Sequence, residues 1–319
     1  MTGMDEMSPE YRMTPSMRDT QEFCLQNGSD EYSQITVEVY VEGSQDVKFY
    51  ESWVDNSKLD EGLDNLSIVV KTINDVDDDE EDLETPENAI GNCVRVREFA
   101  KLNENYIRKI WISDRDLMTD EDLKSYSQSN LFFTDFPAIE SYGFLPEVLS
   151  RVNKYMYKSR LKALDACFDF VRDYLRGVYF YRCNLQLVEN PPKVKVWRNG
   201  TLDKLEEYVK MNTENQSIDD FIEFASGVIP EEIVEKMSSV NVYNLDPRTY
   251  AYGHDIAPAI KRFIAFEEKS LEGKAKGIKD IESSILENYI DGKFYTRDCL
   301  FTQLGERIKY VHNELKVKN

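Results

Sequence analysis

Histidine is scarce in this chain of 319 residues, which contains only His254 and His312. A metal site built from several histidines is therefore excluded. The five cysteines are scattered and none forms a CxxC pair, so neither a disulfide framework nor a zinc–cysteine site is expected. Any bound metal must be held mainly by oxygen atoms, which favours Mg²⁺ or Mn²⁺.

Long apolar runs are missing as well. No segment approaches the roughly 18 consecutive apolar residues that a membrane-spanning helix needs. Residues 1–34 do not show the basic and apolar pattern of a secretory signal. We therefore predict a cytoplasmic protein without a membrane partner. Hydrophobic residues still make up 41% of the chain, enough for a sizeable core.

Basic residues are outnumbered, since 39 Lys and Arg face 60 Asp and Glu, which gives a net charge of −21. That charge alone argues against a nucleic-acid partner, because phosphate groups must be neutralised by positive charge. The distribution is uneven, however. Residues 151–210 contain 13 basic and 7 acidic residues, a balance of +6. We predict that this segment contacts a nucleic acid, with phosphate contacts among Lys154, Lys158, Arg160, Arg172 and Arg176.

The alternation of strands and helices indicates the fold class. Period-two or compact apolar runs predict strands at 35–41, 66–72, 107–112 and 131–134. Helices are expected after Gly43, with Ser44 as the N-cap, and at 85–102. This order is typical of a parallel sheet flanked by helices, an α/β fold.

We predict three parts in the chain, an N-terminal arm at 1–33, the α/β domain at 34–150 and a mainly helical domain at 151–319. The clearest helical pattern runs from Leu161 to Val178 and is interpreted as core or dimer seam. Further predictions in the last part are a short strand at 194–197 and helices at 201–211, 217–225, 230–237, 256–267 and 297–315.

Three carboxylates stand where predicted strands end. Glu42 follows the first strand, and Asp114 and Asp116 follow the third, two residues apart and so on one side of an extended chain. In open α/β sheets, ligands bind outside the carboxyl ends of the strands. Carboxylates gathered there would repel one another unless a cation neutralised them. The spacing predicts a divalent metal site and metal-assisted phosphoryl transfer.

Other candidates are less specific. Asp135 or Glu140 could add a fourth acid, and Glu140 lies among apolar residues, where an unpaired charge is costly. His254 could orient a phosphate or transfer a proton, while Asp255 beside it could be a simple N-cap. Any one of the acids, taken alone, is as well explained as a solvated loop residue.

Two rival motifs fit poorly. Haloacid-dehalogenase phosphatases carry Asp-x-Asp after the first strand with Thr or Val two residues on, whereas here the third strand precedes it and Met118 takes that place. An EF-hand beginning at Asp75 fails because its sixth position is Glu80 and its twelfth is Pro86. We interpret the acidic run at 75–84 as a solvated loop that can face a partner.

Four stretches together carry a resemblance to a known family: "VEVYVEGSQDVKFYESW", "IWISDRDL", "FTDFPAIESYGFL" and "AYGHDI". In this order they resemble a bacterial TOPRIM-like family, and most closely the TOPRIM effector subunits of PARIS anti-phage systems. The resemblance covers residues 35–150 well and 151–319 loosely. It implies a TOPRIM-like core in the α/β domain.

The resemblance also implies roles for individual residues. Glu42 matches the TOPRIM glutamate, and Asp114 and Asp116 match the Asp-x-Asp, which implies that these three are the catalytic residues. Together with Glu140, which matches the later acid, they are implied as Mg²⁺ or Mn²⁺ ligands. The family pattern also includes an Asp three residues after the glycine, here Asp46, and a Gly-His-Asp, here with His254. Met118 departs from the third acid of many TOPRIM proteins, which leaves two-metal occupancy open.

At the level of function, the resemblance implies a Mg²⁺-dependent endonuclease of antiviral defence. Such effectors are held by an ABC-type ATPase subunit of the same system and cleave RNA, with transfer RNA implied, once released; an active homodimer is left open. The competing interpretations are a non-catalytic TOPRIM-like interaction module, whose acidic surface binds the partner, and a different phosphoryl-transfer enzyme.

Overall fold

The computed structural model describes residues 35–59, 63, 65–76, 91–116, 118–185, 246–267 and 281–318. The predicted N-terminal arm lies outside these residues, as does most of the acidic run at 75–84. The same holds for the strand predicted at 194–197 and the helices predicted at 201–211, 217–225 and 230–237. These features stay predictions.

The core of the fold is a sheet of four strands, β1 (Ile35–Val41), β2 (Leu66–Thr72), β3 (Lys109–Ser113) and β4 (Leu131–Phe133). Their order is β2-β1-β3-β4 and every pairing is parallel, which confirms the predicted α/β sheet. Because β1 lies between β2 and β3, the carboxyl ends of β1 and β3 are neighbours. Glu42 and the Asp114 segment therefore leave the sheet at one edge.

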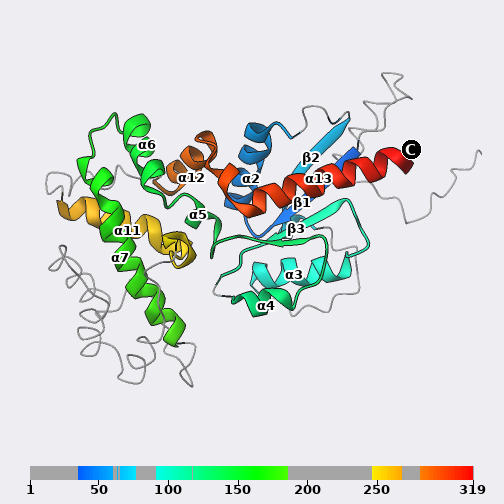
Figure 1. The fold of residues 1–319 in the computed structure, drawn as a ribbon, viewed down its shortest axis with the longest axis horizontal. Coiled ribbons are helices and arrows are strands. Elements are labelled where there is room, and N and C mark those ends of the chain that lie inside the picture. Colours follow the sequence, from blue (N-terminus) through cyan, green and yellow to red (C-terminus); the bar gives the residue numbers. More distant parts are fainter. Residues whose placement is uncertain are drawn as a thin grey trace, which may run out of the picture.

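Helices cover both faces of the sheet (Figure 1). On one face, α2 (Ser44–Ser57) and α13 (Cys299–Lys318) pack their aromatic and aliphatic side chains against Val37, Val39 and Val41. On the other face, α3 (Asn92–Leu102) contributes Phe99, which stacks on Trp111 with ring centroids 5.8 Å apart. Alternate side chains of β1 thus point to opposite faces of the sheet and pack into two separate apolar layers.

The second half of the chain is mainly helical in the described residues. From Pro146 onward, its described helices besides α13 are α6 (Pro146–Met156), α7 (Lys162–Leu185), α11 (Gly253–Glu267) and α12 (Ile281–Asp291), with the short segments η4 (Pro247–Thr249) and η7 (Phe294–Arg297). The short helical segments of the first half are η2 (Ile73–Asp75), α4 (Asp120–Lys124) and α5 (Ile139–Tyr142). Leu164, Val171 and Leu175 of α7 are fully buried, so the predicted stripe belongs to the core.

Elements from both sides of the predicted domain boundary at residue 150 pack against each other. Helix α12 packs against α2, α5 and α6, and α13 packs against β1 and β4. One hydrophobic cluster contains residues from both sides of residue 150, including Val39 of β1 and Phe301 of α13. In Figure 1, α12 and α13 return from the helical half to the sheet. No described helix is long and apolar enough to cross a membrane.

Candidate metal centre at the carboxyl edge of the sheet

Glu42 joins the ends of two neighbouring strands. Its Oε1 accepts a hydrogen bond from the Asp114 N–H at 2.8 Å and another from the Ser113 hydroxyl at 3.2 Å. Neither bond uses Oε2. The backbone carbonyl of Glu42 accepts a third bond from the Asn92 side chain at 2.8 Å, which ties the start of α3 to the same edge. The structure therefore brings Glu42 beside the Asp114 segment.

Asp46 reaches back from the first turn of α2 to the same place. Its Oδ2 accepts the N–H of Gly43 at 2.8 Å, and Gly43 is the N-cap. Ser44 was the predicted N-cap; that prediction is wrong, because the Asp46 carboxylate supplies the capping bond and Ser44 is already helical. A Cβ at Gly43 would stand 3.3 Å from Asp46 Oδ2, so this turn is closely packed.

Asp116 does not continue the extended chain that the sequence suggested. Its φ of 50° lies in the left-handed region, and its N–H donates to the carbonyl of Pro137 at 3.0 Å. The buried guanidinium of Arg97 organises this turn: it donates to Ser113 Oγ at 3.0 Å and to the Asp114 carbonyl at 2.9 Å, and lies 3.8 Å from Asp116 Oδ2. The Tyr252 hydroxyl contacts Asp116 Oδ1 at 3.4 Å.

Burial and crowding make these carboxyl groups resist ionisation. Burial raises the pKa of Glu42 to about 7, and the charges of Asp46 and Asp116 add to the shift. The pKa of Asp46 rises to about 6, again mainly through burial. Burial, followed by the charge of Glu42, raises the pKa of Asp114 well above its ordinary value. A divalent cation among these carboxyl groups would remove the repulsion between them and favour their ionised forms.

A second group of ligand atoms lies next to these acids. One oxygen of Glu140, one oxygen of Glu282 and one imidazole nitrogen of His254 all lie within 4.8 Å of one another, which is a spacing that could hold a metal ion. His254 Nδ1 is 3.9 Å from Glu140 Oε1. Among the described residues no other set of three acidic, His or Cys side chains reaches this spacing. The predicted ligand Glu140 is thus grouped with His254 rather than with Glu42.

Electrostatics link the two groups. Burial, and then the neighbouring Glu282, raises the pKa of Glu140 to about 7. The charge of Asp46 raises the pKa of Glu140 and also that of Asp114, while the charge of His254 lowers the pKa of Asp46. Glu140 also raises the pKa of Asp114 directly, and His254 lowers that of Asp116. The strand-end acids and the Glu140 group therefore affect each other both directly and through Asp46.

Asp135, the alternative fourth acid, has a different role. Its Oδ2 accepts the Leu300 N–H at 3.0 Å and the Tyr142 hydroxyl at 3.1 Å. These bonds attach the start of α13 to the loop after β4. Of the two acids considered for this position, only Glu140 joins a candidate metal group.

The predicted phosphate-contacting residues lie on α6, α7 and the turn between them. Lys154, Lys158 and Arg160 are exposed, and Lys154 Nζ lies 5.2 Å from the ring centre of Tyr155, which is 56% exposed. Arg172 pairs with Asp169 at 2.7 Å. Arg176 is half-buried on α7. The exposed basic side chains therefore concentrate at the end of α6.

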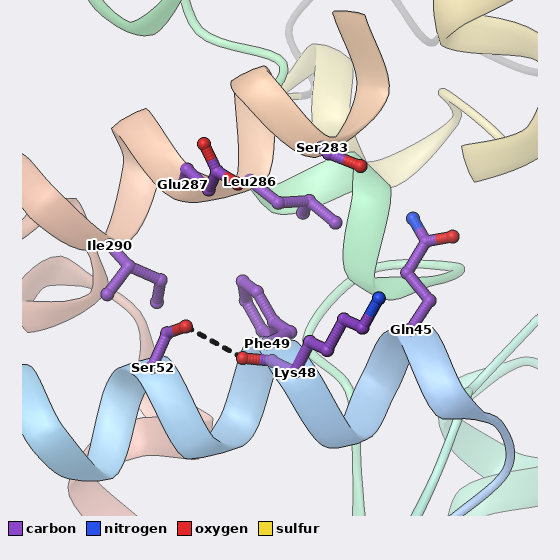
Figure 2. Close-up of a pocket in the computed structure, with 8 residues that line it drawn as sticks. All are labelled: Gln45, Lys48, Phe49, Ser52, Ser283, Leu286, Glu287 and Ile290. Carbon is purple, nitrogen blue, oxygen red and sulfur yellow. Dashed lines mark hydrogen bonds between the residues drawn. The ribbon is translucent and has the colours of Figure 1, made fainter. Parts of the chain in front are cut away.

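A groove lies between α2 and α12 (Figure 2). It encloses about 150 Å³, and its lining consists of Gln45, Lys48, Phe49, Ser52, Ser283, Leu286, Glu287 and Ile290. Gln45 also donates to Glu282 Oε1 at 3.0 Å, so a residue that lines the groove is hydrogen-bonded to the candidate metal group. The lining combines an apolar floor with one cationic side chain, Lys48.

The sequence did not reveal Glu282, Arg97 or Tyr252 as part of this region. Glu282 lies in the first turn of α12, a helix that was not predicted. The apolar positions 281, 285 and 289, spaced by four, were the signal that could have located this helix. No sequence pattern marks Arg97, and although Tyr252 stands within "AYGHDI", nothing in that stretch indicates its contact with Asp116, because both contacts depend on the tertiary fold.

Comparison of the chain with protein-family models, with curated proteins and with solved structures found no match. The motifs, the sheet and the site geometry are therefore the basis for assigning a function to this protein.

Proposed function

We propose that this protein is a Mg²⁺-dependent nuclease with a TOPRIM-like core, which hydrolyses phosphodiester bonds in RNA. One observation carries the proposal: Glu42 at the end of β1 is hydrogen-bonded to the segment that holds Asp114 at the end of β3, at the carboxyl edge of a parallel sheet. Ligands of open α/β sheets bind at this edge. The quoted motifs supply the resemblance to TOPRIM effectors.

The donor set suits a hard divalent cation. Glu42, Asp114 and Asp116 offer only carboxylate oxygens, which Mg²⁺ and Mn²⁺ prefer. Burial first, and then the charges of the neighbouring acids, raise the pKa values of Glu42 and Asp114, and a cation between the carboxylates would offset the repulsive part. A bound divalent ion would stabilise negative charge on the phosphoryl oxygens of the substrate.

The protein's own groups have distinct roles in this proposal. Glu42 is the candidate metal ligand or general base, because its carboxylate lies beside the Asp114 segment at the carboxyl ends of β1 and β3. Arg97 holds the backbone of Asp114 and the side chain of Asp116 in place through its bonds to Ser113 and Asp114. Arg97 is thus a positioning residue.

The substrate and the partner are proposed from charge and resemblance. The exposed Lys154, Lys158 and Arg160 offer a phosphate-binding surface in a protein of net charge −21. The acidic remainder, including the run at 77–82, suits docking onto a basic surface of an ABC-type ATPase of the same defence system. Co-expression with that ATPase should yield a stable complex and suppress toxicity; the chain expressed alone without growth arrest would count against release as the sole switch.

The direct test of function is cleavage of total cellular RNA in Mg²⁺, with EDTA as the metal-free condition. Wild type should cut RNA only with the metal, and Asp114→Asn should be inactive because it removes a charged ligand. Asp55→Asn, an exposed Asp on α2, is the matched control and should cut normally. An active Asp114→Asn protein would refute the metal mechanism, and an inactive wild type would favour the interaction module.

A further inference from the structure

The Glu140 group differs chemically from the strand-end carboxylates because it contains an imidazole. We propose that Glu140, His254 and Glu282 form a separate binding site for a divalent transition metal such as Mn²⁺, next to the Mg²⁺ site. The three ligand atoms lie within 4.8 Å of one another. The proposal goes beyond the nuclease function, since metal binding at this site requires no catalytic activity.

Three separate elements bring the ligands together. Glu140 belongs to α5, His254 to the first turn of α11 and Glu282 to the first turn of α12. The hydrogen bond from Ser141 Oγ to the carbonyl of Ala251, at 2.6 Å, fixes α5 against the start of α11. The site therefore depends on packing between α5, α11 and α12, rather than on neighbouring positions in the sequence.

Glu140 provides an independent sign that a ligand is required. The residue is only 6% exposed, and its Oε2 is buried without a hydrogen-bond partner. Ionising this carboxyl group without a donor or a cation beside Oε2 would destabilise the folded state, because the buried oxygen has lost its water. A metal cation beside the carboxylate would remove this cost. The second acid, Glu282, would complete the neutralisation of a divalent ion, and its Oε1 is held by Gln45 at 3.0 Å.

The ligand chemistry selects the class of metal. Mg²⁺ prefers oxygen ligands in octahedral geometry and releases its waters reluctantly, whereas imidazole nitrogen suits the first-row transition metals. Two carboxylates with one imidazole form a mixed set that Mn²⁺ and its heavier neighbours accept. The His254 side chain is 77% exposed, so solvent and a substrate phosphate can reach the remaining coordination positions.

Electron paramagnetic resonance of Mn²⁺ added to the tag-free full chain tests the site directly. Because the chain has only two histidines, coupling of Mn²⁺ to a ¹⁴N nucleus identifies an imidazole ligand with little ambiguity. Wild type should show this coupling, and His254→Ala should lose it together with at least about tenfold in Mn²⁺ affinity, since even outer-shell changes cost 10–100-fold. Folding should persist because the His254 side chain is exposed.

Two further variants separate this site from the strand-end site. Glu282→Gln should weaken Mn²⁺ binding, whereas Glu287→Gln, one turn further along α12 and exposed, should leave it unchanged. Glu42→Gln should keep the nitrogen coupling, because Glu42 is not a ligand of this site. A wild-type spectrum without ¹⁴N coupling, or coupling and affinity that survive in His254→Ala, would overturn the proposal even if the nuclease function holds.

Discussion

At the scale of single residues, Gly253 determines the space left for the Glu140 carboxylate. A Cβ at this position would stand 2.2 Å from Glu140 Oε2 and 3.0 Å from the Cβ of Ala138. An added methyl group would displace the carboxylate, since the backbone of α11 is packed against α5 and cannot easily retreat. Gly253 thus shapes the candidate metal group without contributing a ligand atom to it.

We therefore predict that Gly253→Ala folds but binds Mn²⁺ at least about tenfold more weakly, in line with the effect of displacing a ligand or its supports. A titration that follows only the nitrogen-coupled Mn²⁺ resonance measures the loss at this site, separately from Mn²⁺ bound by the strand-end carboxylates. Gly91→Ala is the matched control, because its added Cβ would meet only Cys93 Sγ at 3.7 Å. If Gly253→Ala binds Mn²⁺ like wild type, Glu140 is not a ligand.

The raised pKa values of the acids predict how stability depends on pH. The pKa values of Glu42 and Glu140 rise from 4.5 to about 7, so the folded protein binds more protons than the unfolded chain between these values. Stability in EDTA should therefore be full below about pH 4.5, as far as these two groups are concerned, and fall as pH rises to about 7.

Urea unfolding at several pH values, in EDTA and in Mg²⁺, checks this prediction. The loss of stability between about pH 5 and 7.5 should be smaller in Mg²⁺, because the cation compensates the carboxylates once they ionise. Glu42→Gln should show a shallower loss in EDTA than wild type, since it cannot ionise at this position. Stability that instead rises across this range with the same slope in both proteins would contradict the assigned pKa shifts.

Some residues of the site were predictable and others were not. Glu42 and Asp114 could be located because strand ends are visible in the alternation of apolar residues, and parallel strands bring their ends together. The turn at Asp116 could not, because its left-handed backbone depends on the bond to Pro137 and on Arg97. The metal role of Glu140 stays a prediction, and its grouping with Glu282 was not foreseen.

At the scale of elements, the end of α6 is the place where a nucleic-acid contact can be tested. We predict that Lys154→Glu with Lys158→Glu weakens RNA binding and lowers the slope of log affinity against log salt by about one for each phosphate that is no longer neutralised. Lys124→Glu on α4, also exposed, is the control for net charge. Unchanged affinity and unchanged slope in the double variant would place the binding surface elsewhere.

The elements found from sequence are those with a strong apolar period. β1 and β2 have the predicted bounds, and α7 covers most of the helical pattern predicted at 161–178. Helix α6 escaped prediction although Pro146 takes one of its first positions, because only Val148, Leu149 and Val152 mark its buried face. Helix α12 was missed although Ile281, Ile285 and Tyr289 recur every four residues, because the polar Ser284 and Asn288 are buried as well and blur the helical period.

At the scale of the whole molecule, the candidate site joins the two halves of the chain. Glu140 comes from the first 150 residues, whereas His254 and Glu282 come from helices of the second half. The sequence predicted these halves as separate domains, because local periodicity carries no information on which helix returns to the sheet. In the structure, α12 packs on α2 and α5, and this packing positions Glu282.

The central claim is that the strand-end carboxylates bind Mg²⁺, and the most direct test is the rise in melting temperature that Mg²⁺ causes. At about 100 times the dissociation constant, a bound ion adds about 2.7 kcal/mol to stability. Wild type and Glu51→Gln, an exposed control on α2, should show the corresponding rise. Glu42→Gln should fold in EDTA and lose that rise; a Glu42→Gln protein with the full wild-type response to Mg²⁺ would contradict the claim.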